Sequence, residues 1–240
     1  WKLKYPIVLP EYKECKDAVN SFYFVQTLSE KLGEKAVIIT DMGTSFTCTM
    51  QTFKTKLGQR LSTSSGHASM GFGLPGAIGA CIGNNRKDTI CISGDGGLQM
   101  NIQELQTIVH YNLPIKLFVL NNNGYLTIKA TQQNHFGRFV GAEKSSGVTC
   151  PDIIKIATAY GLPNTRIANT EELNLKLDSV LQATGPIVCE IIMEENQPLI
   201  PRVSSLKKPD GTIISKPIED LYPFLSREEF RENMIVDPAE

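Results

Sequence analysis

Short apolar segments that alternate with helical patterns constrain the fold of this chain more than any other feature. Residues 36–40, 89–93 and 115–120 are rich in Ile, Val and Leu, and the last of them shows no polar–apolar alternation. Strands without alternation are typical of parallel sheets, in which helices cover both faces. The sequence therefore predicts an α/β fold, with a single domain built on a mostly parallel central sheet flanked by helices.

Spacing of apolar residues and turn residues predicts the other elements and the domain limits. Helices are expected at 17–32, 71–82, 98–111, 151–160 and 171–181, and a last strand at 186–193. Residues 1–13 resemble an extended linker from a missing upstream domain, and residues 14–194 form the predicted domain. Residues 195–240, rich in proline and charge, predict an irregular C-terminal tail that wraps the surface, with a short helix at 226–233.

Polar residues follow two consecutive predicted strands. Gly94-Asp95-Gly96 ends one strand, and Asn121-Asn122 ends the next, which places Asp95 and Asn122 27 positions apart. A helix that begins after Gly97 and a Leu-Pro turn separate them, so both side chains should emerge at one edge of the sheet. Carboxylate and amide oxygens suit a hard divalent cation, and glycines let an anion approach the backbone. The pattern favours a magnesium–diphosphate site.

Simpler interpretations exist for each part of this pattern. Asp95 alone predicts a helix cap, and an Asn pair alone predicts a turn. Gly71–Gly76 also fits GxGxxG, with Asp95 19 residues beyond Gly76. A dinucleotide fingerprint must follow a strand directly, and the Ser-rich stretch before Gly71 predicts none. Close packing of a Gly/Ala-rich helix explains that motif better than a nicotinamide cofactor does.

The GDG and NN segments together resemble the diphosphate-binding motif of thiamine-diphosphate enzymes. Residues 69–75, 99–105, 113–116 and 201–203 are further similar to acetolactate (acetohydroxyacid) synthases. The resemblance covers nearly the whole chain, but only the C-terminal diphosphate-binding (PP) domain of that family. It implies the thiamine-diphosphate-binding fold, with thiamine diphosphate and Mg²⁺ as cofactors.

The resemblance also assigns roles to individual residues. It implies that the Asp95 and Asn122 side chains and the Gly124 carbonyl hold the metal. Met70 would support the bent cofactor, and the Ala68 carbonyl would accept from its aminopyrimidine amine. The full set of implied cofactor-binding residues is Gly43, Thr44, Ser45, Ala68, Met70, Gly94, Gly96, Gly97 and Tyr125.

The implied reaction is decarboxylation of a 2-oxo acid such as pyruvate, followed by carboligation. In the family the activating glutamate comes from the pyrimidine-binding domain of another subunit, and FAD, where used, binds the central domain. We therefore expect a homodimer or homotetramer, and no catalytic residue in this chain, which should be inactive alone. Synthases carry a tryptophan soon after the Asn pair, whereas residues 125–131 have none. A related lyase or transferase with another acceptor, or a non-catalytic assembly domain, stays open.

Composition narrows the remaining function classes. The 240 residues hold 24 Lys and Arg against 25 Asp and Glu, a balance that predicts no nucleic-acid partner. No apolar run approaches the length that spans a membrane. Six scattered cysteines without a CxxC pair indicate reduced thiols and a cytoplasmic protein. The chain begins with Trp1, so we expect it to be part of a longer protein.

Other polar residues carry weaker hypotheses. His67, which precedes the Met70 segment, is either a pocket acid/base or a structural histidine. His110 and His135 have no partner at a meaningful spacing and are interpreted as structural. Lys207-Lys208 is interpreted as a solvated pair, and Arg202 is a candidate contact for an anionic substrate.

Overall fold

The computed structural model describes residues 1–207 and 209–237 and comprises two compact units. The first unit is Trp1–Gln197 and the second is Pro198–Glu240. The first holds the main sheet and nearly all of the helices, so it carries the functional argument.

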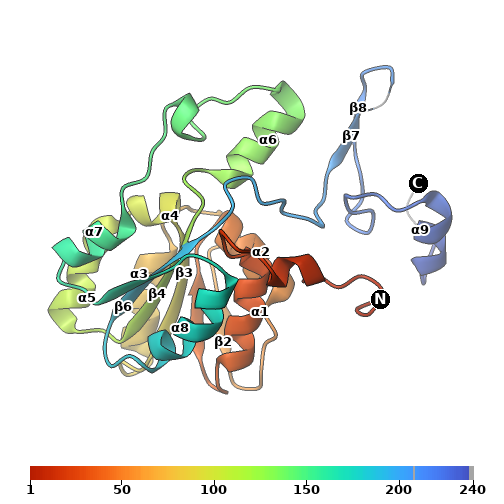
Figure 1. Ribbon diagram of the computed structural model, residues 1–240. Coiled ribbons are helices and arrows are strands. Elements are labelled where there is room, and N and C mark those ends of the chain that lie inside the picture. Colours follow the sequence, from red (N-terminus) through yellow and green to blue (C-terminus); the bar gives the residue numbers. More distant parts are fainter. Residues whose placement is uncertain (208, 238–240) are drawn as a thin grey trace. The chain divides into compact units, whose positions relative to one another are not determined.

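A six-stranded parallel sheet forms the centre of the first unit, in the order β2-β1-β3-β4-β6-β5 (Figure 1). The strands are β1 (Val37–Thr40), β2 (Arg60–Ser62), β3 (Thr89–Gly94), β4 (Ile115–Asn121), β5 (Asn164–Ile167) and β6 (Ile187–Ile192). The predicted α/β fold with a parallel sheet is confirmed. Because all six strands run in one direction, their carboxyl ends share one edge, where parallel sheets bind ligands.

Helices cover both faces of this sheet (Figure 1). One face carries α1 (Ser21–Lys31), α2 (Thr44–Thr52) and α8 (Thr170–Gln182). The other carries α3 (Gly73–Gly83), α5 (Leu105–Tyr111) and α7 (Ile153–Ala159). The short α4 (Asp95–Gln99) follows β3, and α6 (Leu126–Phe136) follows β4. No helix within the described residues is both long and apolar enough to cross a lipid bilayer.

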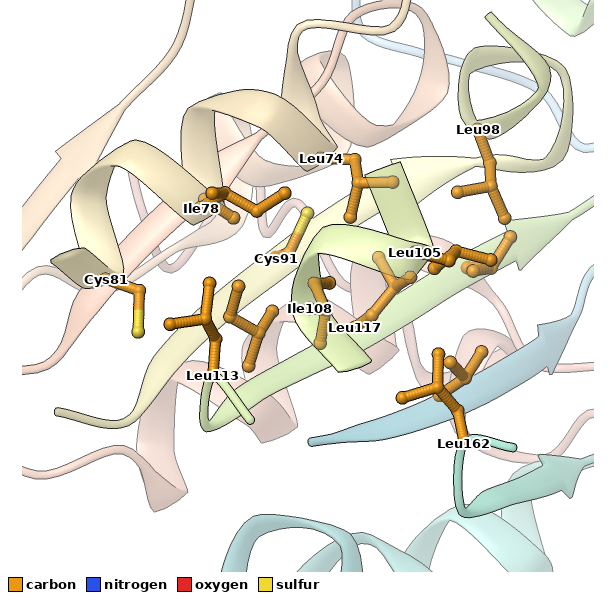
Figure 2. Close-up of a cluster of buried hydrophobic side chains, with 14 of the residues drawn as sticks. Leu74, Ile78, Cys81, Cys91, Leu98, Leu105, Ile108, Leu113, Leu117 and Leu162 are labelled. Carbon is orange, nitrogen blue, oxygen red and sulfur yellow. The ribbon is translucent and has the colours of Figure 1, made fainter. Parts of the chain in front are cut away.

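Buried apolar side chains fix the helices to the sheet. On the α3/α5/α7 face, Leu74 and Ile78 of α3 and Ile108 of α5 meet Leu117 of β4, which Figure 2 shows in close-up. On the opposite face, the ring of Phe24 in α1 lies 5.3 Å from the ring of Phe118 in β4. The unbroken apolar character of β4 follows from this arrangement, because successive side chains enter two different cores.

Local hydrogen bonds explain where the predicted helices were wrong. The helix expected at 17–32 begins at Ser21, because the Asn20 side chain accepts from the N–H groups of Phe22 and Tyr23 and caps it. The helix expected at 98–111 is three pieces, α4, a 3₁₀ turn at Ile102–Glu104 and α5. The break follows Asn101, whose side chain donates to the Gly71 carbonyl at 2.8 Å. The expected helix start after Gly97 was also wrong, since α4 begins at Asp95.

The second unit has ordered elements within the tail that was predicted to be irregular. Strands β7 (Ser205–Lys207) and β8 (Ile213–Ser215) form an antiparallel hairpin, and α9 (Arg227–Asn233) matches the predicted short helix. The buried Asp220 carboxylate accepts from the Arg227 guanidinium at 2.7 and 2.9 Å and pairs with Lys216 at 2.7 Å. Whether this tail wraps the surface stays a prediction, and Lys208 lies outside the described residues.

Candidate functional site

A pocket of about 230 Å³ lies beyond the carboxyl ends of β1, β3 and β4. Eleven of the twelve residues predicted as ligands line it: Gly43, Thr44, Ala68, Met70, Gly94, Asp95, Gly96, Gly97, Asn122, Gly124 and Tyr125. The exception is Ser45, which is buried and donates through Oγ to the Met42 carbonyl at 2.9 Å. The structure thus gathers segments from four different loops, and the roles of these residues stay predictions.

Asp95 is the buried charge of the pocket. It follows β3 directly and is 2% exposed. Its Oδ1 accepts from the N–H of Gly96 at 2.8 Å, and its Oδ2 accepts from the N–H of Gly124 at 3.1 Å. Burial raises the pKa of this carboxyl to about 6, although the two N–H donors oppose the shift. A cation beside the carboxylate would remove that cost of burial.

The Asn122 amide converges on the same point. One end of this amide lies 2.8 Å from the Gly124 carbonyl oxygen and 3.2 Å from Oδ1 of Asp95. With its nitrogen at that end, the amide donates to both oxygens. With its oxygen there, three oxygens face one another and need a cation between them. A carboxylate, an amide oxygen and a carbonyl oxygen suit Mg²⁺, so the donor set fits the predicted metal.

The turn after β4 depends on a glycine at position 124. Gly124 has φ +157°, and a Cβ there would lie 2.5 Å from the Ala142 carbonyl oxygen. That carbonyl accepts from the N–H of Tyr125 at 2.8 Å, which holds segment 142–143 against the turn. Any side chain at position 124 would push this segment away and move the carbonyl that faces Asp95 and Asn122.

A second part of the pocket lining, at the start of α2, suits an anion. Helix α2 begins at Thr44 after Gly43, and its first N–H groups have no partner within the helix. Gly43 and Thr44 both line the pocket. A helix N-terminus with free N–H groups attracts phosphate oxygens, so this wall fits the predicted diphosphate. Gly96 must also lack a side chain, because a Cβ there would overlap the Tyr125 ring.

Comparisons with known proteins agree with this geometry. Residues 41–191 match the family model described as "Thiamine pyrophosphate enzyme, C-terminal TPP binding domain". The chain belongs to this family. The matched residues include both pocket walls and all three predicted metal ligands. The expected resemblance to thiamine-diphosphate enzymes is therefore confirmed.

Individual relatives point to one branch of the family. The chain is 32% identical to an acetolactate synthase large subunit of Cyanidium caldarium over 207 residues, which is 85% of the chain and 34% of the relative. It is 33% identical to that of Pyropia yezoensis over 219 residues, 90% of the chain and 36% of the relative. It is 31% identical to acetolactate synthase 2, chloroplastic, of Nicotiana tabacum over 210 residues, which is 85% of the chain and 31% of the relative. The chain thus spans about a third of these relatives' length.

Asp41 is a buried acidic residue next to the pocket segments of this thiamine pyrophosphate enzyme domain, and the sequence analysis did not single it out. It is 1% exposed and lies just beyond β1. Its carboxylate accepts from the N–H of Gly71 at 3.0 and 3.2 Å, from Oγ of Ser93 at 2.8 Å and from the N–H of Met42 at 2.8 Å. It thereby joins the turn that carries Ala68 and Met70 to the ends of β1 and β3. The only sequence signal was an acidic residue directly after an apolar strand.

Cys150 was also missed. Its thiol hydrogen-bonds to Asp95, and burial together with the Asp95 charge raises the pKa of Cys150 to about 12. The thiol therefore stays protonated at neutral pH and acts as a neutral donor to the carboxylate. Nothing in the sequence around Cys150 indicates this contact, because the segment between Tyr125 and Cys150 has no regular pattern.

The histidines lie away from this pocket lining. His67 is exposed and is not among the pocket residues, although Ala68 is. His110 and His135 are exposed on α5 and α6, beside Tyr111 and Phe136. The acid/base hypothesis for His67 therefore gains no support from the lining of the pocket.

Replacing Asp41 with asparagine tests whether its carboxylate holds the turn at Gly71 to the ends of β1 and β3, which we call its junction role. One amide oxygen cannot accept from all three donors, and the new NH₂ group faces donors, so we expect the unfolding free energy to fall by about 2 kcal/mol. Amide exchange at Gly71 should accelerate. Asp178→Asn, which removes an exposed ion pair with Lys31, is the matched control and should change stability by less than about 0.5 kcal/mol. Equal effects from both variants would contradict the junction role.

The raised pKa of Asp95 predicts a pH dependence of stability in the metal-free protein. The folded pKa of about 6 exceeds the unfolded value near 3.9, so the folded state binds the proton more tightly between these values. Stability from this group is complete below pH 3.9 and is lost as pH rises through 6. When the pH is lowered from 7.5 to 4.5, the unfolding free energy of the wild type, measured in urea, should rise by roughly 2 kcal/mol relative to that of Asp95→Asn. A difference that stays flat over this range would contradict the shift.

Proposed function

We propose that this chain binds thiamine diphosphate through Mg²⁺ in an acetolactate synthase-like enzyme that decarboxylates a 2-oxo acid and transfers the resulting two-carbon unit. The observation that carries the proposal is the meeting of Asp95, Asn122 and the Gly124 carbonyl within 3.2 Å, next to an anion-binding wall. A helix cap or a simple turn taken alone does not bring a buried carboxylate, an asparagine amide and a carbonyl oxygen together at one point.

The residues divide the work of binding between them. The Asp95, Asn122 and Gly124 oxygens would hold the ion, and the α2 N-terminus with Gly43 and Thr44 would hold the diphosphate. When bound, the cofactor supplies the group that stabilises the carbanion formed in 2-oxo acid decarboxylation. Met70, which is 39% exposed in this chain, and Ala68 would contact the cofactor from the turn that Asp41 holds. The chain's contribution is placement and electrostatics.

The whole enzyme, in this proposal, needs parts beyond these residues. The relatives are about three times the length of the matched region, in keeping with a pyrimidine-binding domain that supplies the activating glutamate. We propose a homodimer or homotetramer in which another subunit provides it, with FAD confined to a central domain. The intact oxygen donor set argues against a purely non-catalytic assembly role, because a scaffold has no use for three converging metal ligands.

A related enzyme with a different acceptor is the second candidate. The observation that favours it lies in α6, where Thr127 and Ile128 line the pocket and no tryptophan stands between Asn122 and Gly137. A smaller side chain at this wall leaves space that an acetolactate synthase of the resembled type fills. The 2-oxo acid and the decarboxylation would be the same in both candidates, and only the carbonyl partner would differ.

Isothermal titration of the intact protein with thiamine diphosphate tests the binding function. We expect saturable binding that requires Mg²⁺, and Asp95→Ala should weaken it by more than about 100-fold because it removes a direct ligand. Asp88→Ala is the matched control, since Asp88 is 68% exposed and lies at the other end of the sheet. Metal-independent binding, or equal losses in both variants, would contradict the assignment.

Product analysis separates the two candidates. An acetolactate synthase incubated with pyruvate alone forms a five-carbon hydroxy-oxo acid, and we expect this product if pyruvate is both donor and acceptor. Release of CO₂ from pyruvate with the carboligated product appearing only after an aldehyde or sugar is added would favour the second candidate. Absence of CO₂ release from any 2-oxo acid tried would contradict both.

A further inference from the structure

The Asn121 side chain closes the turn that carries two of the proposed metal ligands. Its Oδ1 accepts from the N–H of Asn123 at 3.0 Å, and the backbone carbonyl of Asn121 accepts from the N–H of Met193 at 2.9 Å. This closure holds Asn123 in the left-handed conformation, with φ +58°. The conformation of residues 122–124 therefore depends on where the Asn121 amide points.

Glu190 determines that direction. It lies on β6, where its register partner is Val119 of β4, two residues before Asn121 and on the same face of the sheet. Oε1 of Glu190 accepts from Nδ2 of Asn121 at 2.6 Å. Because Nδ2 is fixed by this bond, Oδ1 must face the Asn123 N–H. The Glu190 side chain is only 1% exposed, so water does not compete for the contact.

The Arg166 guanidinium compensates the buried charge of Glu190. Nε of Arg166 on β5, its register partner, donates to Oε2 at 2.6 Å. The Arg166 side chain is 44% exposed, and its Nη2 lies 3.5 Å from Oδ1 of Asp152, the N-cap of α7. The chain of contacts therefore runs from the surface through β5 and β6 to the turn after β4.

We propose that Glu190 is a positioning residue for the metal-binding turn, acting through the Asn121 amide. This inference rests on the proposed Mg²⁺ function and adds a residue that contacts neither the ion nor the cofactor. Glu190 accepts one hydrogen bond on each oxygen, and both of its partners are donors. Only a carboxylate satisfies two donors this way, whereas a glutamine offers one acceptor and one donor.

The test replaces Glu190 with glutamine in the intact protein. One of the two donors then faces an NH₂ group. Either the Asn121 amide or the Arg166 guanidinium therefore loses its hydrogen bond to residue 190. Mg²⁺ affinity, titrated with thiamine diphosphate present, should fall roughly 10- to 100-fold, as is typical for partners that orient metal ligands. In the metal-free protein, hydrogen exchange at the Asn123 amide should accelerate, which reports on the turn independently of any metal.

Two further variants separate positioning from general destabilisation. Lys116→Met removes another buried charged group, at the opposite end of β4, where its Nζ donates to the Ala183 and Gly185 carbonyls at 2.5 and 2.7 Å. It should lower stability but leave Mg²⁺ affinity and Asn123 exchange within about twofold of the wild type, since it lies far along the strand from the turn.

A polarity swap provides the rescue. Combining Glu190→Gln with Asn121→Asp gives the new amide NH₂ a carboxylate to donate to, while its oxygen still accepts from Arg166. The second carboxylate oxygen accepts from the Asn123 N–H, and the total charge equals that of the wild type. We expect this pair to recover most of the Mg²⁺ affinity and exchange protection lost in Glu190→Gln alone. If Glu190→Gln does not fold, Arg166→Gln perturbs the same network from its exposed end and should weaken Mg²⁺ binding.

The outcomes distinguish this inference from the function on which it rests. Unchanged Mg²⁺ affinity and unchanged Asn123 exchange in Glu190→Gln would overturn the inference while the wild type still binds the cofactor. Equal weakening by Lys116→Met, or a swap variant no better than Glu190→Gln, would overturn it as well. A wild type that binds no Mg²⁺ would overturn the proposed function, and the Asn123 exchange would still show whether Glu190 shapes the turn.

Discussion

The burial of one carboxylate at the end of a central strand is the constraint on which this site depends. Asp95 is 2% exposed and has no basic side chain among its described hydrogen-bond partners. Two backbone N–H groups and a thiol partly satisfy it, and its pKa is nevertheless raised. An ionised group in such a position is costly unless a cation joins it. The fold therefore holds a carboxylate where either a proton or the proposed metal ion would offset the cost of burial.

Much of the fold was visible in the sequence because buried parallel strands leave an unambiguous apolar signal. The segments at 89–93 and 115–120 became β3 and β4, and the residues after them meet at one edge as expected. Helix α2 was missed because its Thr, Ser and Cys residues have low helix propensity, and its stability comes from packing on α1 and β1. Strands β2 and β5 are edge strands with partly exposed residues, so they carry no apolar run.

The site was predictable only as far as the residues proposed to bind the metal directly. Asp95, Asn122 and Gly124 are readable because glycines and paired asparagines mark strand ends with known chemistry. Asp41 and Glu190 are single acidic residues within or after apolar strands, and apart from the adjacent Met42 N–H their partners lie 24 to 69 positions away. Such a partner depends on sheet order and register, which local patterns do not contain. The break after Asn101 has the same cause, because its side chain bonds to Gly71.

Two pairs of polar side chains, which include these missed residues, lie on one face of the sheet on either side of the apolar Val119. Asp41 bonds to Ser93 of β3, which is in register with Val119, and Val119 is in register with Glu190, which pairs with Arg166. On the same face of the sheet, the side chains two residues earlier in β1, β3, β4 and β6 are apolar: Ile39, Cys91, Leu117 and Val188.

The change from apolar to polar side chains occurs at the level where the strands end and the loops begin. Within each pair the polar partners satisfy one another, so the desolvation cost is offset locally, and the loops on either side are tied to the sheet. A site built beside these pairs gains the rigidity of the sheet even though the residues proposed as ligands lie in turns. The α6 side chains that line the pocket, by contrast, belong to a helix that contains neither of these pairs. The proposed acceptor wall can therefore vary in sequence while the proposed metal-binding edge keeps its geometry.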